Sequence, residues 1–339
     1  MTIQENIDLL PYNTFNLSAH ARYFTIVSDP GELQQVLASE IFRTNPFLIL
    51  GGGSNVLLTK DFPGLVIKNE IKGIEIIDET PDNVRLKVGS GEPWHKFVMY
   101  AVDRNYGGIE NLSLIPGTCG AAPMQNIGAY GVEVKDVIQQ VETVDLETGT
   151  VRTFGNKECE FGYRESIFKH SLKGKVFISS ITLTLTKRNH HFNISYGAIK
   201  DVLKENGNAE VTVKSVSDAV ISIRRSKLPD PTVIGNAGSF FKNPSITESA
   251  FNKLKEKFPA IPSFPGENGL IKIPAAWLIE QNGWKGKTFF NIGVHKNQAL
   301  VLVNYGGGEG RKIWELAREI RSSVIDKFNI ELQPEVNVI

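Results

Sequence analysis

Short apolar runs separated by glycine, proline and charged residues dominate the first two thirds of the chain. Runs of about four to eight apolar or alternating residues, bounded by turn residues, are typical of β-strands. We therefore predict strands at Phe47–Leu50, Val56–Thr59, Gly64–Ile67, Ile74–Ile77, Val84–Val88, two within Val141–Phe154 joined by a Glu-Thr-Gly turn, Val176–Thr186 and Gln298–Asn304.

Other segments have the longer period of an amphipathic helix. The strongest lies near the C-terminus, where one helical face is traced by Ile313, Leu316, Ala317, Ile320, Val324 and Phe328. Capping residues and proline positions predict one helix from Asp29-Pro30 to Ser39 and another that Ser90 caps, with Pro93 in its first turn. Further apolar faces predict helices over Tyr196–Lys204, Ser217–Arg225 and Pro274–Gln281, and Gly283 is expected to end the last of these.

This mixture predicts an α+β protein, and 339 residues are enough for two or three domains. Proline cannot continue a helix, so the sequence Leu228-Pro229-Asp230-Pro231 predicts an extended break and a domain boundary. Hydrophobic residues make up 41% and charged residues 22%, which is ordinary for a globular protein and leaves ample material for a core.

The charge balance argues against a nucleic-acid or anionic-membrane partner, because Lys plus Arg and Asp plus Glu number 37 each. The N-terminus lacks the basic and apolar regions of a secretory signal, and no apolar run approaches the roughly 20 residues of a membrane span. The only cysteines, Cys119 and Cys159, have no metal-type spacing. We therefore expect a cytoplasmic protein without a metal site that acts on small molecules.

The first candidate binding segment follows the strand at Phe47–Leu50 and consists of Gly51, Gly52, Gly53, Ser54 and Asn55. Glycines leave backbone N–H groups open to a phosphate. It is not a Rossmann turn, because a strand-like run follows it where a helix should begin, and no Gly-Lys-Ser or Gly-Lys-Thr makes it a P-loop. A plain tight turn is an equally good interpretation of these residues alone.

The second candidate segment, Pro116–Gly131, is longer and consists mostly of small residues. Such a backbone can lie flat against a bulky ligand and donate its amides to a pyrophosphate, although a long surface loop has a similar composition. The cofactor contacts we expect here are Pro116, Gly117, Thr118, Gly120, Ala121, Asn126, Gly128, Ala129, Tyr130 and Gly131.

These two segments, in this order, resemble those of the UDP-N-acetylenolpyruvoylglucosamine reductase family. The resemblance covers nearly the whole chain. It continues through Glu110–Ile115, Glu160–Phe168, Lys227–Pro231, Gly235–Pro244 and Leu332–Val336. Agreement across so many separate blocks is not expected by chance.

The resemblance implies a two-lobed FAD-binding fold of the vanillyl-alcohol-oxidase-like class with a separate substrate domain. We expect a first lobe at 1–70, with 329–339 returning to the site, a second lobe at 71–226 and a substrate domain at 227–328. FAD is expected to be bound without a covalent link, because Gly51–Asn55 contains neither histidine nor cysteine; His95 is expected to be structural.

The family reaction implied by the resemblance passes hydride from NADPH through FAD to the enolpyruvyl group of UDP-N-acetylglucosamine enolpyruvate, giving UDP-N-acetylmuramate in peptidoglycan synthesis. By resemblance, Arg164 stabilises the charge on the substrate carboxylate and Ser239 donates a proton. Glu335 is either protonated or orients a partner such as Arg164 or water.

The nucleotide part of the substrate is expected to contact Tyr163, Tyr196, Lys227, Asn243 and Gln298. Tyr196-Gly197 resembles the longer variant of the family, in which a tyrosine-bearing loop closes over the nucleotide. NADPH and the sugar nucleotide are expected to use one site in turn. We expect a monomer.

Two other functions fit a flavin-binding fold, because a fold alone does not fix the activity. One is an FAD oxidase that uses molecular oxygen on an alcohol. The other is a non-catalytic sensor of flavin or of a sugar nucleotide. Arg164, Ser239 and Glu335 argue against both, since neither function has an evident need for them.

Overall fold

The chain, described from a computed structural model over residues 1–196, 198–205 and 210–339, forms two compact units. The first unit comprises Met1–Ile7, Ala21–Gly52 and Pro63–Ser226. The second unit comprises Asp8–His20, Gly53–Phe62 and Lys227–Ile339. The chain passes from one unit to the other at five points, and the last of these, after Ser226, lies close to the proline-containing segment Leu228–Pro231. The finer division into two flavin lobes and a substrate domain stays a prediction.

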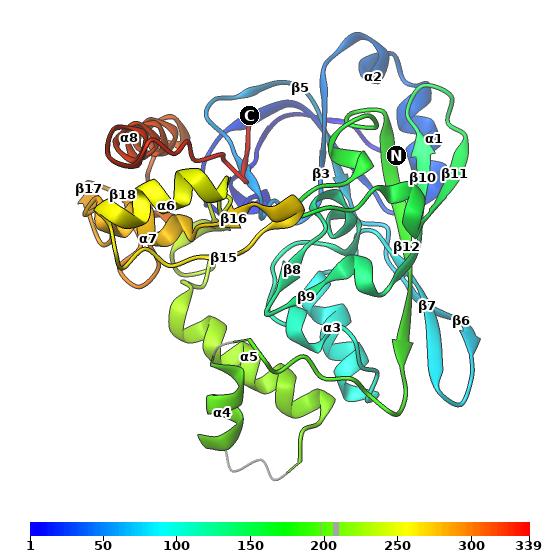
Figure 1. Ribbon diagram of the computed structural model, residues 1–339. Helices are drawn as coiled ribbons and strands as arrows, with labels where there is room; N and C mark the ends of the chain where they lie inside the picture. The colour runs from blue at the N-terminus through cyan, green and yellow to red at the C-terminus, as the bar shows by residue number, and fades with distance from the viewer. Residues whose placement is uncertain (197, 206–209) are drawn as a thin grey trace. The chain divides into compact units, whose positions relative to one another are not determined.

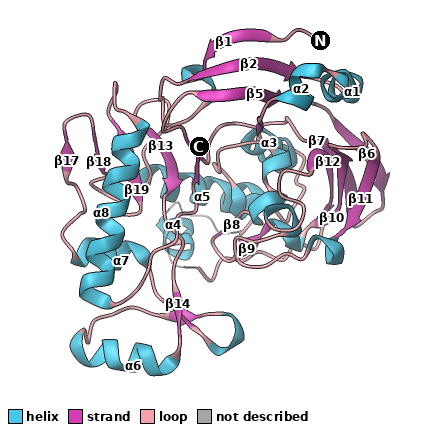
Figure 2. Ribbon diagram, turned by 90° about the horizontal axis from the view of Figure 1, so that it is seen from above, coloured by secondary structure: helices cyan, strands magenta, loops and turns pink. Residues whose placement is uncertain are grey.

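A four-stranded sheet, most of which belongs to the first unit, is formed by the N-terminal part of the chain (Figure 2). Its order is β1 (Gln4–Asp8), β2 (His20–Val27), β5 (Phe62–Asn69) and β3 (Phe47–Leu50). β3 and β5 are parallel, and the chain between β2 and β3 forms helices α1 (Pro30–Ala38) and α2 (Glu40–Thr44). α1 begins where the sequence predicts, because the Asp29 side chain accepts a hydrogen bond from the Glu32 N–H.

The larger sheet of the first unit is antiparallel throughout and has the order β11-β10-β12-β7-β6 (Figure 1). Its strands are β11 (Val151–Gly155), β10 (Ile138–Asp145), β12 (Val176–Thr186), β7 (Asn83–Gly89) and β6 (Ile74–Glu79). All five strands confirm runs that the apolar pattern predicts. The Glu-Thr-Gly turn between β10 and β11 is also confirmed, and its Gly149 has φ +71°.

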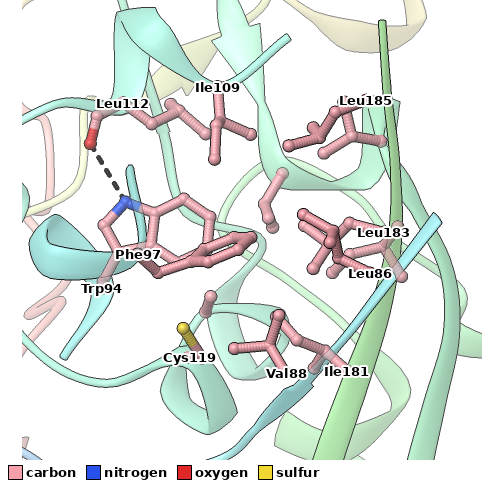
Figure 3. Close-up of a cluster of buried hydrophobic side chains, with 14 of the residues drawn as sticks. Leu86, Val88, Trp94, Phe97, Ile109, Leu112, Cys119, Ile181, Leu183 and Leu185 are labelled. Carbon is pink, nitrogen blue, oxygen red and sulfur yellow. Dashed lines mark hydrogen bonds between the residues drawn. The ribbon is translucent and has the colours of Figure 1, made fainter. Parts of the chain in front are cut away.

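Helix α3 (Trp94–Asp103) packs its apolar face against strands β7 and β12 of this sheet (Figure 3). Trp94 and Phe97 are fully buried and meet edge to face, with ring centroids 5.8 Å apart. The Trp94 indole N–H donates to the Leu112 carbonyl at 3.0 Å, so its polar atom is satisfied. Full burial of a side chain such as Phe97 contributes about 1.5–3 kcal/mol, and this core fixes the loops that follow α3.

The second unit contains a sheet of order β13 (Gly235–Ser239), β19 (Val301–Asn304), β18 (Ile292–Val294) and β17 (Thr288–Phe289). Helix α8 (Gly310–Phe328) packs on it through the six apolar residues that the sequence predicts, all of them buried. Helix α7 (Ala275–Gln281) ends just before Gly283, which has φ +72° and follows the helix as predicted. The unit also contains helix α6 (Glu248–Lys257) and a small sheet of order β14 (Ser245–Ile246), β16 (Ile271–Lys272) and β15 (Phe264–Pro265). Strands β20 (Asn337–Val338) and β4 (Val56–Leu57) form a separate parallel pair.

Several predicted boundaries are wrong. Ser90 does not cap α3: Pro93 is the cap residue, and Ser90 is buried against the side chain of Asn69. The strand predicted at Gln298 begins only at β19, because Gln298–Val301 forms a turn closed by a Val301 N–H to Gln298 carbonyl bond of 3.1 Å. The sequence run at Val56–Thr59 forms only the two-residue strand β4.

The helices before the break also differ from prediction. Helix α5 spans Val213–Lys227 and begins earlier than predicted, because Thr212 and Ser215 cap it with reciprocal side-chain to backbone bonds of 2.8 and 3.1 Å. Helix α4 spans Ile199–Glu205, and residue 197 of the predicted tyrosine loop lies outside the described residues. Strands β1, β2 and β13 and helices α2 and α6 were not predicted.

Candidate functional site

The two glycine-rich segments meet in the first unit. A side-chain Cβ placed on Gly51 would lie 2.6 Å from the Thr118 hydroxyl oxygen, and one on Gly52 would lie 2.9 Å from the Gly117 Cα. Both distances are too short for non-bonded atoms, so only glycine allows the two backbones to approach this closely. The pair forms a side-chain-free surface of the kind that a planar or phosphorylated ligand requires.

The start of the second glycine-rich segment is fixed by Ser90, which precedes α3, and by Trp94, the first residue of α3. The Trp94 N–H donates to the Gly117 carbonyl at 2.9 Å, and the Gly120 N–H donates to the Ser90 carbonyl at 2.8 Å. A Cβ on Gly120 would lie 2.5 Å from the Ser90 Cβ. Thr118 and Gly120 are buried, whereas Pro116 and Ala121 are exposed. The hydrophobic core around Trp94 therefore holds this segment in place.

The end of the second segment is a tight hairpin of β8 (Gly128–Ala129) and β9 (Val132–Glu133), organised by the buried side chain of Asn126. The Asn126 amide donates to the Gly162 carbonyl at 2.9 Å and to the Glu133 carboxylate at 3.1 Å, and its oxygen accepts from the Lys135 N–H at 3.1 Å. The side chain of Asn126 thus ties the glycine-rich segment to the loop that carries Arg164.

Arg164, the predicted charge-stabilising residue, lies against the β8–β9 hairpin. Its Nη2 donates to the Gly128 carbonyl at 2.8 Å, and its guanidinium carbon lies 5.7 Å from the centre of the Tyr163 ring. Arg164 and Tyr163 are both half-buried. Arg164 has φ +57°, a left-handed conformation that is uncommon outside glycine. A cation is thereby held at the backbone of the glycine-rich segment.

Tyr130, at the tip of the hairpin, joins a group of polar residues that the sequence alone does not connect. Its ring lies edge to face with that of Tyr196, with centroids 5.7 Å apart, and the guanidinium of Arg224 lies near its hydroxyl. Burial raises the pKa of the Tyr130 hydroxyl, which is therefore neutral at physiological pH. Arg224 was not predicted, because no motif in the sequence distinguishes it from the neighbouring Arg225.

His95 has a structural role in the first unit, where its Nδ1 accepts a hydrogen bond of 3.0 Å from the Leu114 N–H. Burial, followed by the nearby charges of Arg224 and Arg225, lowers the pKa of this imidazole. A ring that is neutral and accepts through Nδ1 carries its proton on Nε2.

The rest of the first glycine segment belongs to the second unit. Gly53 has φ +62°, and a Cβ there would lie 2.0 Å from the Tyr12 carbonyl oxygen, so glycine is required on both grounds. The Asn55 amide donates to the Glu335 carbonyl at 3.1 Å, and the Asn337 N–H donates to the Asn55 carbonyl at 3.0 Å. Gly53 and Asn55 thus anchor the segment to the second unit, with half-buried Ser54 between them.

The second unit brings the backbones of Ser239 and Glu335 next to each other. The Glu335 N–H donates to the Phe240 carbonyl at 2.8 Å, and Ser239 is the β13 partner of Val301 on β19. Gly238, before Ser239, has φ +68° with no atom within 4 Å of an added Cβ. Arg164 belongs to the first unit, and its convergence with Ser239 and Glu335 stays a prediction.

The predicted substrate residues of the second unit lie at the ends of its elements. The Asn243 side-chain oxygen accepts the Ala275 N–H at 2.9 Å at the first turn of α7, and the Gln298 side-chain oxygen accepts the Leu300 N–H at 3.3 Å. Lys227 is the exposed last residue of α5. Their contacts with a nucleotide remain predictions.

Across 1–196, 198–205 and 210–339, no three His, Cys, Asp or Glu side chains group as metal ligands would. In those ranges, too, every helix is either too short or too polar to cross a bilayer.

The glycine-rich surface and the fold of the first unit are those of an FAD-binding flavoprotein, and residues 21–155 match the family of FAD binding domains. Residues 230–339 match the C-terminal domain of UDP-N-acetylenolpyruvoylglucosamine reductase. The chain belongs to the UDP-N-acetylenolpyruvoylglucosamine reductase family. This confirms the resemblance of the sequence motifs and the expected α+β, FAD-binding class.

Relatives that match over the full length of the chain support its place in this family. The chain is 50% identical to the reductase of Flavobacterium johnsoniae over 339 residues and 49% identical to that of Amoebophilus asiaticus over 339 residues, with 100% of each chain covered. The crystal structure of the Thermus caldophilus reductase matches with a TM-score of 0.70 at 22% identity, covering 99% of both chains. That structural match extends the shared fold over both units.

Proposed function

We propose that the chain reduces UDP-N-acetylglucosamine enolpyruvate to UDP-N-acetylmuramate with NADPH, through bound FAD, in peptidoglycan synthesis. The observation that carries the proposal is identity of about half the residues over the full length of reductases of this name. The contact of Gly51 and Gly52 with Gly117 and Thr118 supports it, because this surface fits a flavin nucleotide.

The fit of FAD to the residues present rests on the space that the glycines leave. The backbones of Gly52 and Gly117 would hold the nucleotide, and Gly128, Ala129 and Gly131 are further small residues later in the second segment. FAD, when bound, would supply the chemistry of hydride transfer between NADPH and the enol ether. The protein residues bind and orient the substrate, stabilise the charge that develops and supply a proton.

Arg164 is proposed to bind the substrate carboxylate, onto which negative charge spreads when hydride adds to the conjugated carbon. Its guanidinium is permanently protonated and offers a planar fork of donors. The Gly128 carbonyl fixes Nη2, which orients the rest of the fork. A cation held in advance stabilises developing charge without reorganisation during the reaction.

Ser239 is proposed to donate the proton that completes the reduction. A hydroxyl is a weak acid, but the carbon next to the carboxylate is strongly basic after hydride addition, so the transfer is feasible at short range. Gly238 leaves open space beside Ser239. Glu335, whose backbone is fixed through Phe240, is proposed to orient the donor or a water molecule.

The sugar nucleotide is proposed to contact Tyr163, Tyr196, Lys227, Asn243 and Gln298. Lysine suits a diphosphate, tyrosine hydroxyls donate to phosphate oxygens, and the side-chain amides can pair with uracil. We also propose that the protein is cytoplasmic and that it is a monomer. Sedimentation velocity over a range of protein concentrations tests the oligomeric state.

One assay tests the proposed function. The purified protein should show flavin absorbance and oxidise NADPH only when UDP-N-acetylglucosamine enolpyruvate is present. Turnover that consumes oxygen on an alcohol without NADPH would instead establish an oxidase. Flavin binding without NADPH consumption in the presence of substrate would indicate a sensor.

A further inference from the structure

Two asparagine side chains hold the tip of the β8–β9 hairpin to a segment that is distant in the sequence. The Asn111 amide donates to the Tyr130 carbonyl at 3.1 Å and to the Asn193 carbonyl at 2.8 Å. The Asn193 amide in turn donates to the Gly131 carbonyl at 2.9 Å. Three hydrogen bonds therefore join Asn111, the hairpin tip and Asn193 in one network.

Residues 193–196, here called the tyrosine segment, are held to the hairpin along their length. A Cβ on Gly131, which has φ +80°, would lie 2.7 Å from the Asn193 amide nitrogen, so only glycine allows this approach. The Ser195 hydroxyl donates to the Asn193 side-chain oxygen at 3.1 Å. At the other end of the segment, the Tyr196 ring packs edge to face against that of Tyr130. The tyrosine segment is thus fixed at its start by hydrogen bonds and at its end by an aromatic contact.

The core of the first unit anchors Asn111 itself. Asn111 is buried, and so is Leu112, whose carbonyl accepts the hydrogen bond from the Trp94 indole (Figure 3). The Ser113 hydroxyl is hydrogen-bonded to that of Ser217 on α5 at 2.8 Å, in a buried contact. The Asn111 amide therefore extends from a fixed backbone to two loops that have no sequence relation to each other.

The orientation of the Asn111 amide leaves one of its polar atoms unsatisfied. Its Oδ1 is shielded from solvent and has no hydrogen-bond partner in the part of the chain that the structure describes. Turning the amide over would point Oδ1 at two carbonyl oxygens and lose both bonds, so the contacts require this orientation. A buried acceptor without a partner costs free energy, and departures of this kind are expected at functional positions. The side chain is therefore better explained by the placement of two loops than by stability alone.

We propose that Asn111 is a positioning residue that sets Tyr196 against the flavin-binding hairpin. The inference rests on the proposed function, in which the hairpin belongs to the flavin surface and Tyr196 contacts the sugar nucleotide. A loop that becomes ordered only on binding loses conformational entropy at that step, which weakens the contact it makes. The bonds of Asn111 order the tyrosine segment when the protein folds, so the contact of Tyr196 keeps more of its free energy.

The test is a double-mutant cycle between Asn111→Ala and Tyr196→Phe. Tyr196→Phe removes the hydroxyl proposed to contact the nucleotide and keeps the ring that packs against Tyr130. KM for UDP-N-acetylglucosamine enolpyruvate and kcat are measured by NADPH oxidation with the FAD-loaded protein. If Asn111 acts through Tyr196, the effects of the two substitutions on KM are not additive.

Asn304→Ala is the matched control. Asn304 and Asn111 are both 1% exposed, and the Asn304 amide also donates to two backbone carbonyls, those of Phe15 and Asn16, at 2.8 and 3.1 Å. Asn304 belongs to the second unit and has no bond to the tyrosine segment. Asn304→Ala should lower the melting temperature and change KM by the same factor with and without the Tyr196 hydroxyl.

Asn111→Ala should raise KM by about 3- to 10-fold and change kcat by less than about two-fold, since a hydrogen bond between neutral groups has an effect of this size. In the Tyr196→Phe protein the same substitution should raise KM by less than about two-fold, because the contact that Asn111 positions is already lost. A residue with a purely structural role would give equal factors in the two proteins.

Equal factors for Asn111→Ala with and without the Tyr196 hydroxyl would overturn the proposal. If Asn111→Ala does not fold, as judged by circular dichroism, Asn193→Ala, which removes the bond to Gly131, takes its place in the cycle, and additivity there overturns the proposal alone. Additive effects in a protein whose wild type oxidises NADPH with the substrate leave the proposed function intact. A wild type without substrate-dependent oxidation overturns the proposed function and this role together.

Discussion

Three residues of the predicted site have left-handed backbone conformations. Asn126 has φ +42°, Tyr130 +51° and Arg164 +57°, and all three are non-glycine residues. This region is uncommon for a bulky side chain and costs of order 1 kcal/mol or more, so surrounding contacts must hold it. Here those contacts are the Asn126 side-chain bonds and the Arg164 bond to Gly128.

Gly52→Ala should cause loss of FAD. The added Cβ would lie 2.9 Å from Gly117 Cα, so the two backbones must separate and the flavin surface must change. We expect flavin content after purification to fall by at least about ten-fold and the melting temperature to fall by several degrees. Gly155→Ala is the control, because its Cβ has only a Glu158 side-chain atom at 3.5 Å. Full flavin content in Gly52→Ala would refute the steric argument.

Ser239→Ala should separate the two halves of the reaction. Reduction of the flavin by NADPH needs no proton from Ser239 and should keep its wild-type rate. Reoxidation by the enolpyruvyl substrate should slow by about 10²- to 10⁴-fold, the usual contribution of a positioned general acid. Stopped-flow absorbance of the flavin measures both steps. Equal slowing of the two half-reactions would remove Ser239 from the role of proton donor.

The two thiols should be unreactive in the folded protein. Burial raises the pKa of Cys119 well above its ordinary range, and burial, helped by Glu158, raises that of Cys159 to about 12. Only the thiolate reacts readily, so a disulfide reagent near pH 8 should label neither cysteine before unfolding and both afterwards. Labelling of the native protein would show that these sites open.

The raised pKa of Cys159 also predicts a pH dependence of stability. Its pKa rises from about 9 in the unfolded chain to about 12 in the folded protein, so the unfolded state loses its proton first. The contribution to stability is complete below pH 9 and is lost as the pH rises towards 12. Cys159→Ala should therefore reduce the fall in urea midpoint over this window, and an unchanged fall would contradict the shift.

At the scale of elements, helix α8 is stabilised by the burial of the apolar face that its sequence pattern predicts. Its six predicted apolar residues are all buried in the core of the second unit. Their spacing of three or four residues places them on one face, which lies against strands of the sheet. The opposite face is solvent-exposed and carries charged pairs such as Arg311 with Glu315. Such exposed pairs contribute little, so the buried face determines the helix's stability.

Two isoleucines of α8 give a matched test of this statement. Ile320 is fully buried and Ile325 is 40% exposed. Ile320→Ala should lower the free energy of unfolding by about 2–5 kcal/mol, because it leaves a cavity in the core. Ile325→Ala should lower it by less than about 1 kcal/mol. Urea unfolding followed by circular dichroism measures both, and equal losses would mean that the two faces are not distinguished by packing.

At the scale of the whole molecule, each compact unit is assembled from segments that are distant in the sequence. Both units are built from three stretches of chain, and the first glycine segment is divided after Gly52. Neither unit can be complete until the chain up to residue 226 has been made. Binding of a ligand to this glycine segment is therefore coupled to the folding of parts that are far apart in the chain.

Removal of FAD should lower the thermal stability of the whole protein. A ligand that binds only the native state stabilises it by about 2.7 kcal/mol at a concentration of 100 Kd. Deflavinated protein should melt below the loaded form, and added FAD should restore the melting temperature, as scanning fluorimetry can measure. Riboflavin is the control, since it lacks the diphosphate that the glycine backbones are proposed to hold. Equal stabilisation by riboflavin would contradict that role.

The sequence predicted many of the helices and strands whose apolar and polar residues alternate with a clear period over neighbouring positions. Strands β3, β6, β7, β10, β11 and β12 and helices α1, α3, α7 and α8 were predicted. The misses also have physical causes. β2 and β13 lack a clean apolar run, and the start of α5 depends on the Thr212–Ser215 cap. Ser90 was taken for a cap, but it is bonded to Asn69, which is distant in sequence.

The sequence alone determined the family and the identity of the glycine segments, because those depend on residue types in a fixed order. It also determined the face of α8, because helical burial repeats every 3.6 residues. Only the tertiary structure decided that Gly52 approaches Gly117, that the backbones of Ser239 and Glu335 lie next to each other, and that the Asn126 side chain bonds the Gly162 carbonyl. Such contacts join residues whose separation along the chain carries no information about distance, because loop closure and core packing set where they meet.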